Sequence, residues 1–249
     1  MIVVTTSAFA YLISLLLSSL LWLPLSSFSS AILLLLPAII AQQAGRCAFV
    51  AIYHVVEGAI TASIHAHERQ QQQQRQQQQQ LIDVDQEEEQ HHERNLMRLE
   101  LNDWSCGIAA GIGFGAMHAL MLYGTLLASE ASTLGTLYQP SCPQIPSLVN
   151  SALNTMMFSL IDILLMLFTF YGMRKRKSKT YRHRQAGNVA LGICLGIHFM
   201  ATMATTANLL PGGCRIALPL LAIVLLTAGA YLQFGIRLTR FLPKPQQVL

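Results

Sequence analysis

The feature that most constrains this chain is a series of six apolar stretches, each long enough to cross a lipid bilayer. A helix that spans a bilayer needs about 20 mainly apolar residues. The stretches lie at 2–25, 31–58, 104–128, 148–173, 186–210 and 215–236. Only 11% of the residues are charged, against about a quarter in a soluble domain. We therefore predict an all-α fold, a polytopic transmembrane helix bundle of six spans in the lipid bilayer.

The first stretch raises the question of a cleaved signal peptide. It exceeds the apolar core of such a peptide, which has about 7–15 residues, and no Lys or Arg precedes it. We expect a retained helix. The small residues between Leu25 and Ser30 leave cleavage open as the alternative.

The basic residues predict the orientation of the bundle. Fourteen of the sixteen fall on one side of a six-helix zigzag: four in 61–100, seven between Arg174 and Arg184, and three in the C-terminal tail. Arg215 lies on the other side and Arg46 within a span. Cytoplasmic loops are enriched in Lys and Arg, so we predict that both termini lie in the cytosol.

The segment between the second and third spans has a low-complexity composition. A glutamine run from Gln70 to Gln80 precedes an acidic stretch from Asp83 to Glu93. Such a segment cannot bury enough apolar surface to offset the entropy of ordering, so we predict a disordered loop. A coiled-coil partner site is the alternative, although the segment lacks heptads. The predicted parts are 1–60 with two transmembrane helices, 61–103 as the glutamine-rich cytosolic loop, 104–236 with four transmembrane helices, and 237–249 as the cytosolic tail.

Three glycines recur at every fourth residue of the third span, namely Gly107, Gly111 and Gly115. Residues four apart lie on one face of a helix. A ridge without side chains lets a neighbouring helix approach closely, which favours association in lipid. We predict a helix-packing surface, and its partner is either another helix of this chain or a second protein.

Two ionisable residues lie deep in consecutive spans. Asp162 precedes the basic connector by twelve residues, or roughly 18 Å, and His198 follows it by fourteen, or roughly 21 Å. An isolated charge at the bilayer centre costs at least about 2.5–3.5 kcal/mol on insertion scales. We predict a buried polar pair that either shares a proton or forms an ion pair. The alternative is that Asp162 and His198 each form a hydrogen bond to a different partner, which could be a backbone carbonyl, Ser159, Thr202 or water.

A further polar cluster, Gln42, Gln43 and Arg46, lies in the second span. Gln42 and Arg46 are four residues apart and share a helix face. Arg46 either makes a buried contact or extends toward the lipid headgroups, as long basic side chains do. His118, in the glycine-ridge span, is expected to be a satisfied interior group and not a ligand.

Two of the five cysteines, Cys142 and Cys214, fall in predicted extracytoplasmic loops, where disulfides form. We therefore put forward a disulfide between them as a hypothesis. The other three cysteines lie within spans, where they resemble small apolar residues. No cysteine or histidine spacing indicates a metal site.

The motifs of membrane proteases are missing from the sequence. An intramembrane aspartyl protease needs two facing aspartates, and only Asp162 lies deep. The sequence has no HExxH motif of a zinc protease and no convincing serine–histidine arrangement. We expect no catalytic residue, no metal, no cofactor and no nucleic-acid partner.

Several segments, in the same order, resemble the anterior-pharynx-defective (Aph) subunit of γ-secretase. The glycine motif and His198 are the most specific parts of the resemblance. The matching segments are Ser14 to Trp22, the cluster Gln42, Gln43 and Arg46, the glycines Gly107, Gly111 and Gly115, and the sequence LGICLGIHFMATM around His198.

The resemblance implies a non-catalytic scaffold that assembles with presenilin, nicastrin and the presenilin enhancer subunit. Presenilin performs the proteolysis of type I membrane proteins, including those of Notch signalling. The resemblance also implies residence in the endoplasmic reticulum, Golgi and plasma membrane. The competing hypothesis is a transporter or proton channel that uses Asp162 and His198, although we find no internal repeat of the transporter kind.

The chain departs from the family pattern in two respects. The family has seven helices, and this chain shows no counterpart of the first. The family also has a second membrane histidine where this sequence has Asp162. An acid–imidazole pair would preserve the buried polar link in place of an imidazole pair.

Overall fold

The computed structural model describes residues 1–25, 31–76, 87–130 and 138–240. Within these ranges the backbone is helical apart from short connections, with no strand. Six helices in the described residues are long and apolar enough to cross a membrane, so the predicted helical bundle is confirmed. The helices are α1 (Ile2–Leu25), α2 (Ala31–Gln76), α3 (Glu87–Glu130), α4 (Ser147–Arg176), α5 (Tyr181–Thr206) and α6 (Cys214–Arg240), with a short 3-10 turn, η1 (Ala207–Leu209), before α6.

Helices are the expected conformation because lipid offers no hydrogen-bond partner for the backbone, which must then satisfy itself within each span. Hydroxyl side chains in the spans also find their hydrogen-bond partners within their own helix. Ser14 Oγ donates to the Ala10 carbonyl at 2.8 Å, and Thr169 Oγ1 donates to the Leu165 carbonyl at 2.7 Å. Polar residues can therefore occupy apolar spans without an unsatisfied donor.

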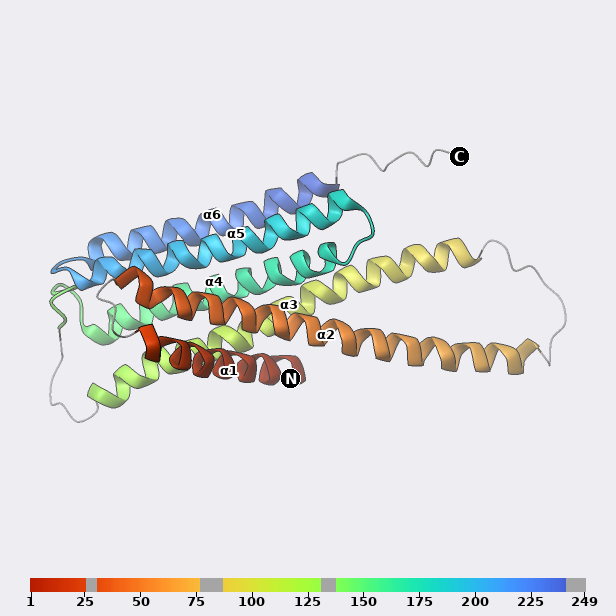
Figure 1. Cartoon of the computed structure of the whole chain (residues 1–249), viewed down its shortest axis with the longest axis horizontal. Helices are drawn as coiled ribbons and strands as arrows, with labels where there is room; N and C mark the ends of the chain where they lie inside the picture. The colour runs from red at the N-terminus through yellow and green to blue at the C-terminus, as the bar shows by residue number, and fades with distance from the viewer. Residues whose placement is uncertain (26–30, 77–86, 131–137, 241–249) are drawn as a thin grey trace.

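Helix α4 is the centre of the bundle. It lies between the α5–α6 pair and the group formed by α1, α2 and α3 (Figure 1). Its most extensive interface is with α3, followed by α5, while α1 packs against α2 and α3. A side chain on α4 can therefore face either half of the bundle.

Two apolar cores flank α4. One core joins α4 to α5 and α6, and the other joins it to α1, α2 and α3. The first includes Ile161, Leu165, Phe168, Cys194, Ala201 and Leu221. The second includes Tyr11, Val50, Ala110, Phe114, Met166 and Phe170. The two cores bury opposite faces of α4, which explains why it is the most buried span.

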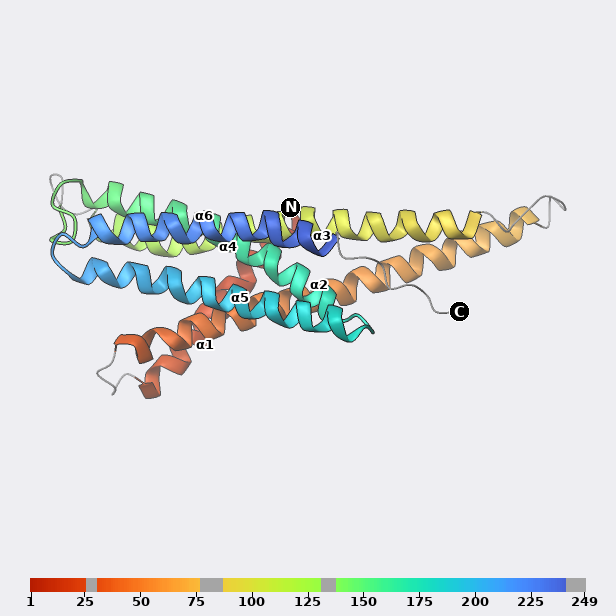
Figure 2. The ribbon, with the colours of Figure 1, turned by 90° about the horizontal axis from the view of Figure 1, so that it is seen from above.

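The segment predicted as a disordered loop, 61–103, differs in the structure. Helix α2 continues to Gln76 and α3 begins at Glu87, so both run past the ends of the other helices (Figures 1 and 2). Gln, Glu and Arg are good helix formers, and a helix that extends an existing span avoids the cost of nucleation. The prediction for 77–86 lies outside the described residues, as does that for most of the C-terminal tail.

Candidate functional site

Arg46 is completely buried in the middle of α2 and contacts three other helices. Its Nη2 donates to Oδ1 of Asp162 on α4, and its Nη1 lies 3.3 Å from Nδ1 of His198 on α5. The guanidinium carbon lies 4.6 Å from the centre of the Phe114 ring on α3. Of the two alternatives for Arg46, the structure therefore has the buried contact and not the extension toward headgroups.

Asp162 is enclosed by two donors. One carboxylate oxygen accepts from Arg46, and Nδ1 of His118 on α3 donates to the other at 2.7 Å. A buried carboxylate is stable when a positive charge and hydrogen bonds compensate the loss of water. His118 is thus a direct partner of Asp162, in agreement with its expected role as a satisfied interior group.

The predicted pair of Asp162 and His198 is joined through Arg46. Among the contacts that the structure describes, the two side chains do not bond to each other directly. A guanidinium carries only donors, so Nδ1 of His198 must accept, and a neutral His198 carries its hydrogen on Nε2. We call Arg46, Asp162, His118 and His198 the central cluster.

The two glutamines next to Arg46 face different neighbours. Gln43 Oε1 accepts from Cys194 Sγ at 3.2 Å, and Gln43 Nε2 donates to Cys47 Sγ at 3.7 Å. Gln42 is buried, and its Oε1 has no hydrogen-bond partner among the described residues. Only Gln42 faces the cavity described next.

A cavity of about 650 Å³ opens beside the central cluster, away from the α4–α5 connection. Gln42, His118 and His198 line its inner part. Four lining residues carry a buried side-chain oxygen that has no partner among the described residues, so a polar molecule that enters the cavity would meet several acceptors. These residues are Gln42, Asn154, Thr155 and Asn208.

The glycine ridge packs against α4. A Cβ at Gly111 would lie 2.5 Å from the Cα of Ile163, and a Cβ at Gly107 would lie 2.8 Å from Cδ2 of Leu167. At Gly115 the nearest atom would be the Ser159 carbonyl oxygen, at 3.0 Å. The three glycines are therefore in contact with an internal helix, the first of the two partners left open by the sequence.

Sequence reasoning missed the contact of His118 with α4, although the position of His118 in its helix indicates it. His118 follows Gly111 by seven residues and Gly115 by three, so all three share a helix face. Once that face is assigned to α4, His118 must also point at α4. The identity of its acceptor, Asp162, requires the register between the two helices, which the sequence does not show.

A second charge cluster lies near the α4–α5 connection. Arg174 Nε donates to Asp103 Oδ2 at 2.6 Å, and Arg174 Nη2 donates to Glu57 Oε2 at 2.7 Å. Nε2 of His54 lies 3.6 Å from Oδ1 of Asp103. His54, Glu57 and Asp103 have the donor types of a metal site, but the Arg174 guanidinium already bridges the two carboxylates. Sequence reasoning missed this cluster because the four residues come from three helices.

A disulfide joins Cys142 and Cys214. Backbone bonds hold the two loops together beside it, from Gly212 N–H to the Pro140 carbonyl at 2.9 Å and from Cys214 N–H to the Ser141 carbonyl at 3.0 Å. Gly212 has a φ of 72°, a left-handed conformation that favours glycine. The disulfide ties the start of α6 to the connection before α4.

The fold and the central cluster define a class, the multi-pass helical membrane proteins whose buried ionisable groups are paired with one another across helices. A family model described as Aph-1 protein matches residues 1–237. The chain therefore belongs to the Aph-1 family, and the resemblance found in the sequence is confirmed. No curated protein and no solved structure matches the chain.

Proposed function

We propose that this chain is a non-catalytic scaffold subunit of γ-secretase that assembles with presenilin, nicastrin and the presenilin enhancer subunit. Its match to the Aph-1 family over residues 1–237 supports a γ-secretase subunit. In this proposal presenilin cleaves the type I membrane substrates, and the chain stabilises the complex in the endoplasmic reticulum, Golgi and plasma membrane. Its C-terminus and its basic edge, the end with the α4–α5 connection, face the cytosol.

The hydrogen bonds to both carboxylate oxygens of Asp162 are the main support for a non-catalytic role. Arg46 and His118 occupy both of its oxygens. The other aspartate in a described span, Asp103, is held by Arg174 near the end of α4. A catalytic aspartate pair requires two carboxylates that face each other, and these two bond to different cations. The arrangement supports a structural use of both aspartates.

The packing is consistent with a platform for other membrane proteins. The central cluster, the glycine ridge and the disulfide all join helices of this chain to one another. The outer faces of α1, α5 and α6 carry exposed apolar side chains, among them Phe9, Met200 and Leu226. These faces are available to lipid or to partner helices.

Affinity purification of the tagged chain from membranes in mild detergent tests the proposal. We expect presenilin, nicastrin and the presenilin enhancer subunit to be recovered together, and the chain to be unstable without them. Gly111→Leu should reduce partner recovery per molecule of chain, because a side chain there meets the α4 backbone. Ile112→Leu is the matched control, since Ile112 points outward. A monomeric chain that is stable without these partners would contradict the proposal.

The cavity favours a second candidate, a transporter or proton channel. His118 and His198 line the cavity, and titratable groups in a membrane cavity often conduct protons. Against this function, an apolar layer of Val50, Met166 and Phe170 lies between the central cluster and the Arg174 cluster. Proton or solute flux into liposomes that contain only the purified chain would support the transporter. Absence of flux, together with recovery of the three partners, would support the scaffold.

A further inference from the structure

The connection between α4 and α5 carries a dense group of basic side chains. Seven of the eleven residues from Arg174 to Arg184 are Lys or Arg, and this stretch contains no acidic residue. We call these eleven residues the basic turn. Five of its basic residues are exposed, namely Arg176, Lys177, Lys179, Arg182 and Arg184.

In the part of the chain that the structure describes, internal contacts involve two of the seven charges. Arg174 bonds to Asp103 and Glu57, and Lys175 Nζ lies 5.8 Å from the centre of the Tyr171 ring. Within the described ranges, no acidic side chain pairs with the five exposed residues. Among the described residues, five positive charges in a span of nine residues therefore have no acidic partner.

The basic turn lies at the edge of the membrane. The span of α4 ends at Arg176 and that of α5 begins at Tyr181, so only four residues separate the two spans. Backbone bonds end α4 in a tight turn, from Lys177 N–H to the Arg174 carbonyl at 3.3 Å and from Ser178 N–H to the Lys175 carbonyl at 3.1 Å. A connection this short keeps its cations next to the ends of the two spans, at the level of the headgroups.

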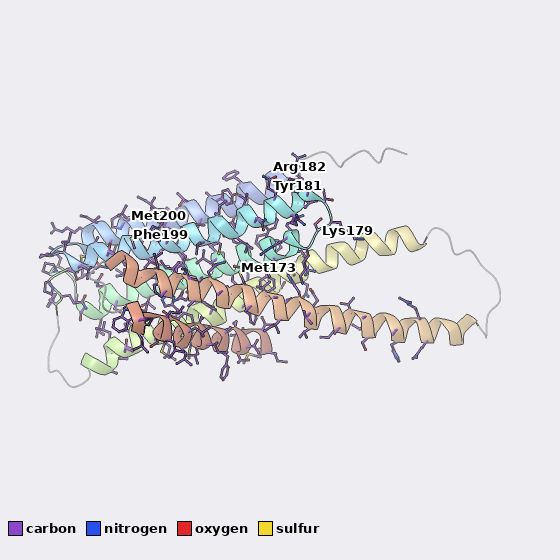
Figure 3. All side chains as sticks on the ribbon, in the orientation of Figure 1. Met173, Lys179, Tyr181, Arg182, Phe199 and Met200 are labelled. Carbon is purple, nitrogen blue, oxygen red and sulfur yellow. A yellow bond between two sulfur atoms is a disulfide. The ribbon has the colours of Figure 1, made fainter. Side chains whose placement is uncertain are left out.

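The five exposed basic side chains of the turn are accessible from outside the bundle. Figure 3 labels Lys179 in the connection between α4 and α5, and Tyr181 and Arg182 at the start of α5. Tyr181 is 72% exposed, and an aromatic ring at this level is typical of the membrane–water interface. An interfacial ring beside several cations suits contact with lipid headgroups.

We propose that the basic turn binds the headgroup of a polyphosphorylated inositol phospholipid in the adjacent leaflet. Clusters of four to eight basic residues next to a membrane helix attract anionic lipids. Guanidinium groups bind phosphate through two parallel hydrogen bonds, and ammonium groups bind it as point charges. Five free cations in one turn match a headgroup that carries several phosphate charges better than one with a single net charge. This binding is independent of any catalytic or scaffold role.

Binding of a fluorescent short-chain phosphatidylinositol 4,5-bisphosphate to the purified full-length chain in detergent tests the proposal. The triple variant Lys177→Gln, Lys179→Gln, Arg182→Gln should bind on the order of 100-fold more weakly, since each basic residue near an anionic surface contributes about fivefold in affinity. The matched control Arg69→Gln, Arg75→Gln, Arg94→Gln removes the same charge elsewhere and should bind within about twofold of the wild type. Added salt should weaken binding to the wild type, because exposed charges are screened.

Four comparisons decide the outcome. Equal binding by the wild type and the triple variant would overturn the proposal, as would binding that does not weaken with salt. If short-chain phosphatidylserine or phosphatidylcholine binds as tightly as the inositol lipid, the assignment of the headgroup is overturned. Binding of soluble inositol trisphosphate, but not of the inositol lipid in nanodiscs, would overturn the assignment to a membrane lipid. A monodisperse triple variant with unchanged thermal unfolding shows that weaker binding is not caused by misfolding.

Discussion

Arg46 and Asp162 form an ion pair that is closed to solvent, although 116 positions separate them in the sequence. Their side chains are 0% and 3% exposed. The pair joins α2 to α4, and His118 and His198 bring α3 and α5 to the same point. Four of the six membrane helices therefore meet at one charge-compensated cluster, and this cluster ties the two halves of the bundle together.

We expect Arg46→Met and Asp162→Leu to be much more harmful singly than together. Either single change leaves an uncompensated charge in the apolar interior, which costs about 3–5 kcal/mol in free energy of unfolding. The double variant removes both charges and should recover most of that loss. Thermal unfolding of the purified chain in detergent, arranged as a double-mutant cycle, measures the coupling. Additive losses would show that the two charges are not coupled.

Gly111→Ala should destabilise the chain by about 1–3 kcal/mol, because overpacking forces backbone shifts. Its new Cβ would meet the α4 backbone at Ile163 Cα. Gly124→Ala, on the same helix, is the control. A Cβ at Gly124 would make an ordinary contact, 3.7 Å from Leu120 Cδ1, so the higher helix propensity of alanine should leave stability unchanged or raise it by up to about 1 kcal/mol. Equal unfolding temperatures for the two variants would disprove close α3–α4 packing.

Arg174→Gln should lower stability by about 1–3 kcal/mol, because Glu57 and Asp103 then lose a charged hydrogen-bond partner. Arg176→Gln removes an exposed charge on the same turn of α4 and should change stability by less than about 0.5 kcal/mol. Chemical or thermal unfolding of both proteins in one detergent provides the comparison. A larger effect at Arg176 would mean that the cluster around Arg174 does not stabilise the bundle.

Replacement of Cys142 and Cys214 by serine should destabilise the chain by about 2–5 kcal/mol, as is typical for the loss of a native disulfide. The link closes a loop between residues 72 positions apart. Peptide mapping under non-reducing conditions should recover the two cysteines in one cross-linked species. Two free thiols would rule out the bridge, and Cys47→Ser is the control for loss of a cysteine outside it.

The helix spans were predictable because their signal is local. A run of about 20 apolar residues is sufficient to predict a span, and all six spans appear near their predicted positions. The prediction of a disordered loop at 61–103 differed from the structure for an equally local reason, since polar residues with high helix propensity extend α2 and α3 beyond the membrane. Depth was predictable as well, because the rise per residue places Asp162 and His198 at similar levels.

Contacts between helices were decided by the tertiary structure. The sequence by itself determined which residues are costly to bury, namely Arg46, Asp162 and His198, because charge and the length of an apolar run are properties of the chain. It did not determine their partners, since a partner depends on the rotation and register of each helix against its neighbours. The bundle brings Arg46 between Asp162 and His198, adds His118, and places α4 against the glycine ridge. The physical reason is that desolvation acts on each residue alone, whereas charge compensation requires a second residue at hydrogen-bond distance.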